Sequence, residues 1–436
     1  MGLLIDALTL EVPRRPFLMR TGLGILRRNR PVLSMGGAVV VTSEALVREV
    51  FSRPKDFLFG FGNGPKMKLG PFLFGMDASD QYFAEKEALH KVATKDQSVI
   101  DRFGTLVKKH ADACLGRLEP GPSVDLLSSF IEPVLLGASA EFYGVDPEQA
   151  EPSRYVDAAP GFKTYAQWVR KLGGTVGSVW PAPFGLEDLS DRLAEEMRVF
   201  LEKQVDASRS RGAGTASVID GLIGLNPSPL KTSFDIARCI GGLMLAGAAM
   251  IKATTLALHE LLQREAVAAE VANAARNGDL KRVRGYVWEA LRFNPPFPIL
   301  TRYSPRATVL AAGTPNETPV AENTTLFISP LAAMFDPANV DRPEQFISTR
   351  PANTYYIFGF GLHRCFGEQL AVVGLQRIFT SLLAAFKLEK GRIAYDGPAI
   401  ARYTATIDQR IFPEGVNNAS ERTNYPRPRT PHSRAA

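Results

Sequence analysis

The sequence has few cysteines, and it shows neither the pattern of a signal peptide nor an apolar run long enough to cross a membrane. Its 436 residues include three cysteines, Cys114, Cys239 and Cys365, whose odd number and wide spacing argue against a disulfide framework. The N-terminal segment carries charge too early for a signal peptide. The longest uncharged apolar run in the central helical segment, Cys239–Ile251, is shorter than the ~20 residues that span a bilayer. We therefore expect a soluble, cytoplasmic protein without a membrane span.

The sequence also lacks the signatures of nucleotide and nucleic-acid binding. No G-x-G-x-x-G motif follows a strand and opens a helix, so nothing indicates a dinucleotide domain. The net charge is +6, but apart from Arg14–Arg15, Arg27–Arg30 and the tail the basic residues are scattered. This pattern predicts no nucleic-acid partner. The simpler interpretation of these basic residues is a solvated surface. The more specific alternative is a basic patch that binds an acidic redox partner.

Helical periodicity dominates what is present, and strand signals are few, which predicts a mostly α fold with a minor β region. The expected helices are Ser43–Phe51, Asp80–Lys95, Ile100–Leu118, Val124–Phe142 with one early break, Leu186–Ser210, Ser233–Arg264, Leu280–Phe293 and Glu368–Phe386. The expected strands are Ala38–Thr42, Thr308–Ala311 and Thr324–Ser329. Residues 417–436 are polar and rich in Pro and Arg, so we expect a disordered basic tail.

The segment FGFGLHRCFG, Phe358–Gly367, places one cysteine between glycines with a histidine two residues before it. A zinc site fails because His363 and Cys365 supply two ligands at most. A catalytic nucleophile would need an orienting acid that the segment does not supply. A small apolar residue at a helix start is the simplest reading, and an axial metal ligand is the functional one.

The glycines favour the axial ligand. Gly359 and Gly361 permit a tight turn with positive φ, and Gly367 leaves room where a flat macrocycle would press on the backbone. Cys365 would precede the N-terminus of the helix Glu368–Phe386, where free N–H groups and the helix dipole stabilise a thiolate. A thiolate with backbone donors near its sulfur is what an axial iron ligand requires.

FGFGLHRCFG resembles the haem-binding loop of the cytochrome P-450 superfamily, F-x-x-G-x-[HR]-x-C-x-G, at every fixed position. Glu289-Ala-Leu-Arg292 resembles the family's E-x-x-R, and Arg350 is then the third member of a buried ion network. In the same segment Gln345 stands where the family has an arginine. The resemblance implies the cytochrome P-450 fold, a single triangular-prism domain over residues 1–416 with buried haem b (iron protoporphyrin IX).

The resemblance also assigns the haem contacts. Cys365 would be the iron ligand, and Phe358, Gly359 and Gly367 would line the loop around it. Arg302 and His363 match positions that bind the haem propionates. Lys86 and His90, spaced i,i+4, would share a helix face toward a propionate, although the family's usual pair is missing there. For Arg302 the simpler alternative is an exposed position on a strand. For Lys86 and His90 it is a solvated helix face.

The central helix departs from the family, which carries [AG]-G-x-[DE]-[TS] over the haem. Ala246 and Gly247 match the small pair, but Ala249 replaces the acid and Met250 the alcohol, so neither side chain can deliver a proton. Thr254 lies one turn beyond Met250, ~6 Å along the axis, and is too far to substitute. We expect Lys252 on the same helix to be solvated.

Four functions follow as hypotheses. The first is a haem-thiolate monooxygenase that oxidises a small apolar substrate with O₂ and electrons from NAD(P)H, delivered by a ferredoxin or flavodoxin and its reductase. The others are a haem-thiolate peroxygenase or peroxide isomerase/dehydratase, a haem-based ligand-binding or sensor protein, and a haem-free thiol enzyme. Residues expected in the substrate pocket are Phe72, Phe74, Phe297, Ile299 and Leu300, although any single phenylalanine is as well explained as core.

Overall fold

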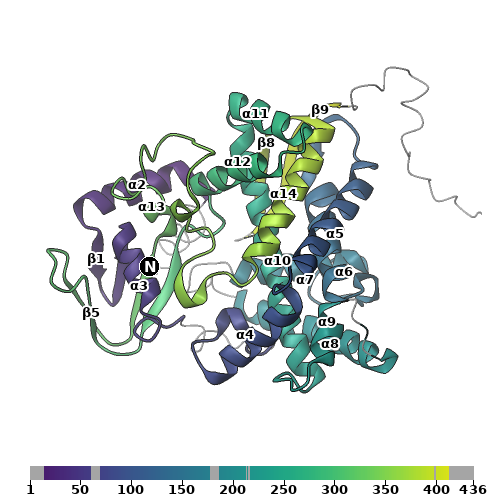
Figure 1. The fold of residues 1–436 in the computed structure, drawn as a ribbon, viewed down its shortest axis with the longest axis horizontal. Helices are drawn as coiled ribbons and strands as arrows, with labels where there is room; N and C mark the ends of the chain where they lie inside the picture. The colour runs from purple at the N-terminus through teal and green to yellow at the C-terminus, as the bar shows by residue number, and fades with distance from the viewer. Residues whose placement is uncertain are drawn as a thin grey trace, which may run out of the picture.

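The computed structural model describes residues 14–59, 69–176, 186–212, 214, 217–396 and 399–411. A smaller part that carries most of the sheet lies beside a larger helical part, and α10 and α14 stand at their junction (Figure 1). This arrangement confirms the predicted fold class of mostly helix with a minor β region.

The helices of the larger part include the segments that the periodicity predicted. They are α4 (Asp80–Ala93), α5 (Gln97–Leu115), α6 (Glu132–Tyr143), α7 (Phe162–Val176), α8 (Leu186–Arg211), α9 (Val218–Gly224), α10 (Ser233–Leu262), α11 (Glu265–Arg276), α12 (Leu280–Phe293) and α14 (Glu368–Ala385). The smaller part carries α2 (Pro16–Asn29), α3 (Glu44–Ser52) and α13 (Pro330–Ala333). The prediction missed α2, α7, α9, α11 and the short α13.

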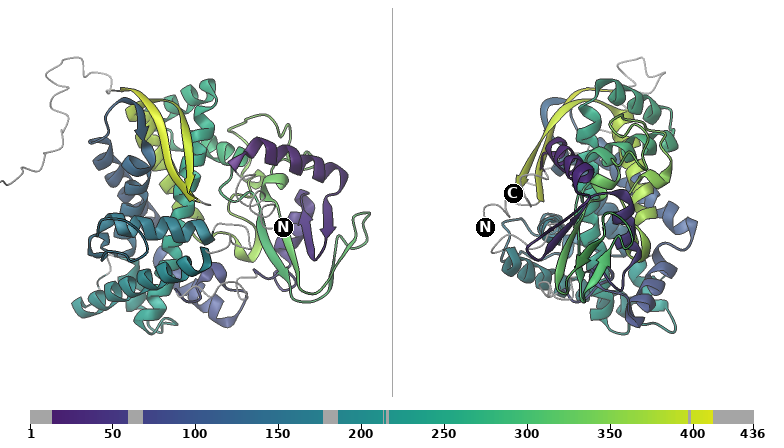
Figure 2. Two further views of the ribbon diagram at one scale, coloured as in Figure 1. Left: turned by 180° about the vertical axis from the view of Figure 1, so that it is seen from behind. Right: turned by 90° about the vertical axis from the view of Figure 1, so that its left-hand side faces the viewer.

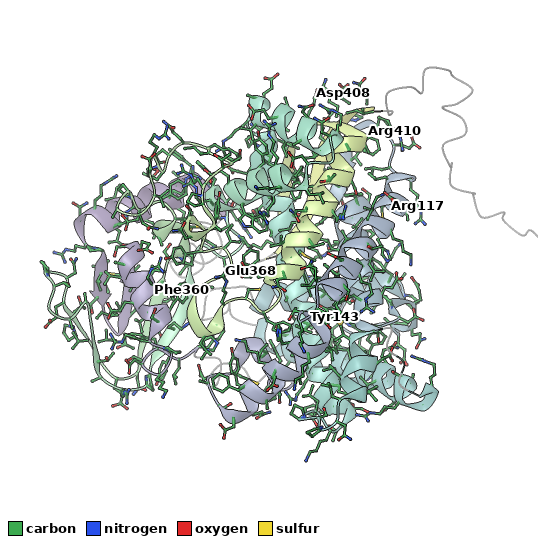
Figure 3. The ribbon with its side chains drawn as sticks, in the orientation of Figure 1. Arg117, Tyr143, Phe360, Glu368, Asp408 and Arg410 are labelled. Atoms are coloured by element: carbon green, nitrogen blue, oxygen red, sulfur yellow. The ribbon has the colours of Figure 1, made fainter. Side chains whose placement is uncertain are left out.

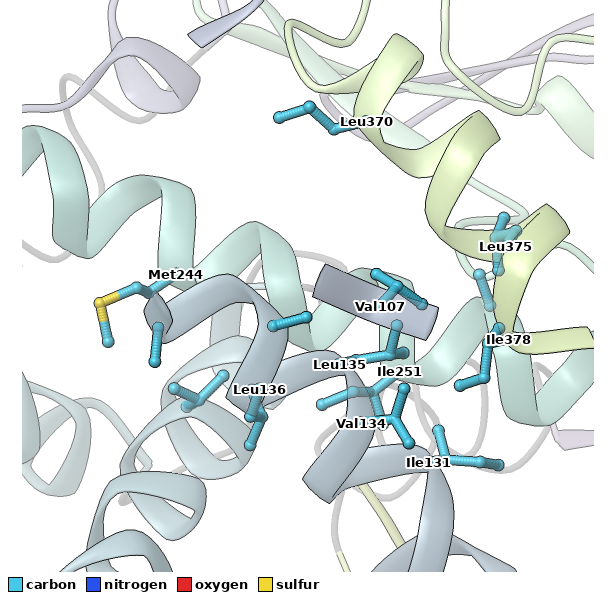
Figure 4. Close-up of a cluster of buried hydrophobic side chains, with 14 of the residues drawn as sticks. Val107, Ile131, Val134, Leu135, Leu136, Met244, Ile251, Leu370, Leu375 and Ile378 are labelled. Carbon is cyan, nitrogen blue, oxygen red and sulfur yellow. The ribbon is translucent and has the colours of Figure 1, made fainter. Parts of the chain in front are cut away.

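Helix α10 runs through the core, and apolar residues cover most of its circumference. Thr232 and Asp235 form a reciprocal capping box that fixes its start. Side chains from α5, α6 and α14 pack around it in one buried cluster, including Val107, Leu135, Ile251 and Ile378 (Figure 4). By length and composition α10 could cross a membrane, but 61% of its most apolar stretch is buried inside the protein. This burial is typical of the core helix of a globular domain.

The main sheet has the strand order β1-β2-β7-β4, built from Val32–Met35, Ala38–Val41, Thr324–Ile328 and Leu300–Ser304. Strands β2 and β7 are parallel, and the other two pairs are antiparallel. Alternate residues of β7 are buried against the second apolar cluster, which lies between the sheet, α3 and α13. Strand β4 matters for the site because it carries Arg302.

A second sheet in the order β3-β9-β8 joins Gly121–Asp125, Ala399–Arg410 and Phe386–Asp396. Strands β8 and β9 form a long hairpin along the helical part (Figure 2). A small pair is formed by β5 (Thr308–Leu310) and β6 (Thr318–Val320). The hairpin was not predicted, and it begins at Phe386, the residue expected to end the preceding helix.

The early break expected in the helical segment Val124–Phe142 is present, but the segment begins as a strand. Strand β3 ends at Asp125, a π-helical turn covers Leu127–Ile131, and α6 begins at Glu132. Pro133 explains the break, because it has no N–H to donate to the preceding turn. The predicted tail, residues 417–436, lies outside the described residues.

Candidate active site

The loop that carries Cys365 needs glycine at two positions. Gly359 and Gly361 have φ of +69° and +71°. A Cβ on Gly361 would lie 2.6 Å from the carbonyl oxygen of Phe51 at the end of α3, so this position excludes side chains for two reasons. The Cys365 N–H donates to the carbonyl oxygen of Phe358 at 2.8 Å and closes the turn. The loop therefore delivers the cysteine to the start of α14 in one fixed orientation.

The Cys365 residue is exposed, and the backbone N–H of Gly367 donates to its sulfur. Desolvation by the surrounding protein nevertheless raises the pKa of the thiol to about 11, against the opposing effects of Gly367 and Arg364. The Gly367 N–H stabilises the thiolate, as expected at a helix start, but desolvation has the larger effect on the pKa of the thiol. A cation bound at the sulfur would supply the missing stabilisation, since metal binding displaces the thiol proton.

The loop borders open space at two of its residues. Cys365 lines a pocket of about 500 Å³, and a Cβ on Gly367 would meet no described residue other than its chain neighbours within 4 Å. Trp288 of α12 supports the opposite end of the loop, with its ring 5.6 Å from that of Phe358. Phe360 and Glu368, which flank the turn, lie at the junction of the two parts of the molecule (Figure 3). No cluster of three or more His, Cys, Asp or Glu occurs in the described part of the chain, so the zinc reading gains no support.

Arg302 on β4 is 4% exposed and has few partners for its five N–H groups. Nη1 donates to the Thr301 carbonyl oxygen at 2.7 Å, and the guanidinium lies 4.7 Å from the Phe59 ring centre. Burial lowers its pKa to about 10; Asp77 opposes this shift, but its carboxylate accepts the Phe59 N–H at 2.7 Å. No carboxylate among the described residues reaches salt-bridge distance of Arg302.

His363 and Lys86 converge on the same region. Burial, then the charges of Arg302 and Lys86, lowers the pKa of His363 to about 4, and its buried Nε2 has no hydrogen-bond partner. The Lys86 Nζ donates to the Leu362 carbonyl oxygen at 3.0 Å and to the Tyr82 hydroxyl at 3.1 Å. We call the cations Arg302 and Lys86, together with the neutral imidazole of His363, the cation cluster.

Among the described residues no carboxylate forms an ion pair with the cation cluster, and Asp77 acts on Arg302 only from beyond salt-bridge distance. Buried polar groups without partners are costly, so such a cluster predicts a ligand that brings negative charge. The two carboxylates of a haem, next to a cysteine that can bind its iron, satisfy both requirements. The residues present therefore fit haem.

His90 stands apart from the cation cluster. It is exposed, and its Nδ1 pairs with the Thr94 Oγ1 at 2.9 Å. It lines a pocket of about 500 Å³ between α4 and the Cys365 loop. The pocket is lined by Phe83, Lys86, Glu87, His90, Thr94, Arg364, Cys365, Phe366, Glu368 and Gln369. The structure thus brings Lys86, His90 and Cys365 to one pocket, and the charge of Lys86 also acts on His363. A propionate contact of Lys86 or His90 stays a prediction.

A buried ion network fixes α12 against the segment that precedes the Cys365 loop. Glu289 Oε1 lies 2.8 Å from Arg292 Nη2 and 3.0 Å from Arg350 Nε, and it also accepts the Ile347 N–H at 2.9 Å. Gln345 takes part through its backbone, because its carbonyl oxygen accepts from both Arg292 and Arg350. The arginine that the family carries at this position is therefore not needed to complete the network.

The middle of α10 is accessible but almost without polar side chains. Ala246 is exposed, and Ala249 and Met250 are partly exposed, whereas Gly247 is buried. The Met250 sulfur fills the space beside Gly374 of α14, 3.3 Å from where a Cβ would lie. The Thr254 hydroxyl donates to the Met250 carbonyl oxygen at 2.8 Å, so it is engaged within the helix. In this stretch the structure therefore shows no side-chain hydroxyl or carboxyl free to deliver a proton.

Lys252, for which we expected a solvated position, is partly exposed and lies over an aromatic ring. Burial lowers the pKa of its ammonium to about 8, and the Nζ lies 5.7 Å from the centre of the Phe297 ring. The sequence showed a lysine on an apolar helix, but the partner ring comes from a separate element and could not be predicted.

The expected pocket residues divide into two groups. Phe297, Ile299 and Leu300 are partly exposed on the segment that leads into β4. Phe72 is 6% exposed and packs against Gly242 of α10, so it belongs to the core. The side chain of Phe74 lies outside the described residues.

Comparison with known proteins places this site in a family. The family model described as Cytochrome P450 matches residues 231–393, from α10 through the Cys365 loop to β8. A putative cytochrome P450 137 of Mycobacterium tuberculosis is 25% identical over 81% of this chain and 75% of its own length. The cytochrome P-450 monooxygenase DoxA of a Streptomyces species is 26% identical over 83% of this chain and 84% of its own.

The fold agrees with solved structures. Substrate-free CYP109E1 from Bacillus megaterium superposes with a TM-score of 0.73 at 16% identity, over 90% of this chain and 99% of the other. The chain belongs to the cytochrome P450 superfamily. This P450 is of the bacterial type, and it is an oxidoreductase of the monooxygenase class, whose members carry haem.

Proposed function

We propose that this P450 is a haem-thiolate monooxygenase that oxidises a small apolar substrate, with Cys365 as the iron ligand. The carrying observation is the cation cluster, which has no ion-pair partner among the described residues, beside a cysteine that lines a pocket of about 500 Å³. Haem, when bound, supplies the activation of dioxygen for insertion of one oxygen atom into a substrate bond. Electrons would come from NAD(P)H through a ferredoxin or flavodoxin and its reductase.

The chain's own residues would hold, orient and shield the reacting groups. Arg302 and Lys86 would pair with the propionates, and His363 Nε2 would gain the partner that it lacks. The small side chain of Ala246 would leave room for dioxygen beside α10. Phe297, Ile299 and Leu300 would exclude water and orient an apolar substrate.

The ligand assignment can be tested by spectroscopy. The reduced protein should give the strongly red-shifted carbonyl spectrum of a thiolate-bound haem, and Cys365→Ser should abolish it. Cys114→Ser is the matched control, since Cys114 is buried in the core away from the loop and the spectrum should persist. Survival of the spectrum in Cys365→Ser, or a protein that cannot take up haem, would overturn the proposal.

A peroxide-driven reaction is a second candidate, favoured by Ala249, Met250 and the engaged hydroxyl of Thr254. A peroxide arrives with its O–O bond already formed and needs no electron supply. Turnover with hydrogen peroxide alone should be compared with turnover using NADPH, ferredoxin and reductase. Activity only with the electron chain would eliminate this candidate, and activity only with peroxide would replace the first proposal.

A further inference from the structure

Lys252 is a cation in an apolar place without an anionic partner. Within the described part of the chain, no carboxylate lies within salt-bridge distance of its Nζ, and its described neighbour is the face of the Phe297 ring. Burial alone accounts for the lowered pKa of the ammonium, with no contribution from a nearby acid. An unpaired buried charge is costly, so a lysine held in this way favours a ligand that carries the opposite charge.

The position of Lys252 on α10 brings it next to the accessible stretch of the helix. Residues three and four apart are neighbours on a helix surface, so Lys252 adjoins Ala248 and Ala249. Long helical side chains lean toward the N-terminus, which directs the ammonium back over that turn. Ala249 is partly exposed, and it is the position at which the family's acidic residue is missing. Lys252 therefore lies next to Ala249, the position at which the family carries an acidic residue.

Phe297 lies between Lys252 and the other residues that we expect to line the substrate pocket. It is partly exposed, and it precedes Ile299 and Leu300, which are also partly exposed. One turn before Lys252, Ala248 packs closely on Gly173 of α7, where an added Cβ would lie 2.1 Å from the Ala248 Cβ. The ammonium itself lies over the ring of Phe297, which belongs to a partly exposed segment, so a ligand lying on that segment can reach it.

We infer that Lys252 binds an anionic group of the substrate, so the substrate is an apolar molecule that carries a carboxylate, held by the ammonium over Phe297. This inference rests on the proposed function, because it places the apolar part of the substrate along Phe297, Ile299 and Leu300. It narrows the substrate class from apolar compounds in general to amphipathic acids.

The test compares acids with neutral analogues of the same skeleton. Decanoate is paired with 1-decanol, and 4-phenylbutyrate with 4-phenylbutanol, on the haem-loaded full chain. Dissociation constants come from titration calorimetry, with the low- to high-spin shift as a second readout. The wild-type protein should prefer an acid by about ten- to a hundredfold, the range expected of a charge-assisted hydrogen bond.

Three variants isolate the charge. Lys252→Met keeps the length of the side chain and should reduce the preference to near unity, whereas Lys252→Arg should retain most of it. Lys281→Met removes an exposed lysine of α12 and should leave the preference unchanged. Haem content and circular dichroism of each variant confirm that it folds. Equal affinity for acid and alcohol in the wild type, no binding of either acid, or a preference that survives in Lys252→Met would overturn the inference.

The two hypotheses fail in different ways. A normal thiolate carbonyl spectrum without acid preference would sink this inference and leave the monooxygenase proposal intact. Acid binding that depends on Lys252 in a protein without that spectrum would sustain the inference and sink the function.

Discussion

Two buried charge clusters on either side of the Cys365 loop are built in opposite ways. Around Glu289, the carboxylate accepts from Arg292, Arg350 and the backbone N–H of Ile347, so the acid and its cations satisfy one another. In the cation cluster, the described part of the chain supplies neither a carboxylate partner for Arg302 nor a hydrogen-bond partner for His363 Nε2. The first cluster is complete without a ligand, and the second is incomplete.

The difference separates residues that hold the fold from residues that hold a ligand. Breaking a satisfied buried cluster destabilises the protein, because the removal of one partner leaves the remaining charges buried without a counter-charge. An unsatisfied cluster costs free energy in the ligand-free protein and returns it on binding. Removal of a charge should therefore have opposite effects on the stability of the ligand-free protein in the two clusters.

The largest effect is expected from Glu289→Gln. It leaves Arg292 and Arg350 buried without a carboxylate, which should lower the free energy of unfolding by about 3–5 kcal/mol. Urea unfolding of the haem-free protein measures this loss. Asp341→Asn is the control, because the exposed pair of Asp341 with Arg342 should contribute less than ~1 kcal/mol. Equal effects of the two substitutions would contradict the contrast between the clusters.

The second largest effect is expected from Arg302→Met. This substitution should stabilise the haem-free protein but weaken its binding of haem. The haem-free protein should become more stable, because an unpaired buried guanidinium is replaced by an apolar side chain. Haem retention should weaken by about ten- to a hundredfold, as expected for the loss of a charge-assisted hydrogen bond. Thermal unfolding and haem transfer to apomyoglobin measure the two quantities. A variant that loses stability in both forms would place Arg302 with Glu289, as a structural residue.

A third pair, Glu132 of α6 with Arg170 of α7, lies between these extremes. The two side chains meet at 2.8 Å, but Glu132 Oε1 and Arg170 Nε have no partners. Desolvation raises the pKa of Glu132 from 4.5 to about 7, against the pull of Arg170. Because the folded state then binds the proton more tightly, its contribution is fully present below pH 4.5 and is lost as the pH rises through about 7.

The free energy of unfolding should therefore fall between pH 4.5 and 7, by at most about 3 kcal/mol at ~1.4 kcal/mol per pKa unit. Glu132→Gln should flatten this part of the profile, as measured by urea unfolding at several pH values. Glu141→Gln, on the exposed face of the same helix, should leave it unchanged. A profile that rises with pH in the wild type, or persists in Glu132→Gln, would show that the pair is better compensated than its geometry indicates.

The sequence predicted the complete cluster better than the incomplete one. Glu289 and Arg292 are an i,i+3 pair on one helix, and the glycines around Cys365 specify a turn, so both features are local. The helix start beside Cys365 is visible in the sequence, whereas the desolvation that raises the pKa of its thiol depends on the packed surroundings. The contact between Lys252 and Phe297 could not be predicted either, since the two residues meet only in the folded chain.

The smallest predicted effect concerns Met250, where the accessible stretch of α10 offers no proton donor. Met250→Thr restores a hydroxyl at the family's position and should raise the fraction of electrons coupled to product severalfold. The gain should stay well below the ~10²–10⁴ of a fully placed donor, because Ala249 still supplies no acid. Met250→Leu separates the hydroxyl from the change in volume beside Gly374 and should keep wild-type coupling. If both variants change coupling equally, packing against α14 is the cause; if Met250→Thr lowers it, α10 is adapted to a reaction in which the substrate or ordered water supplies the proton.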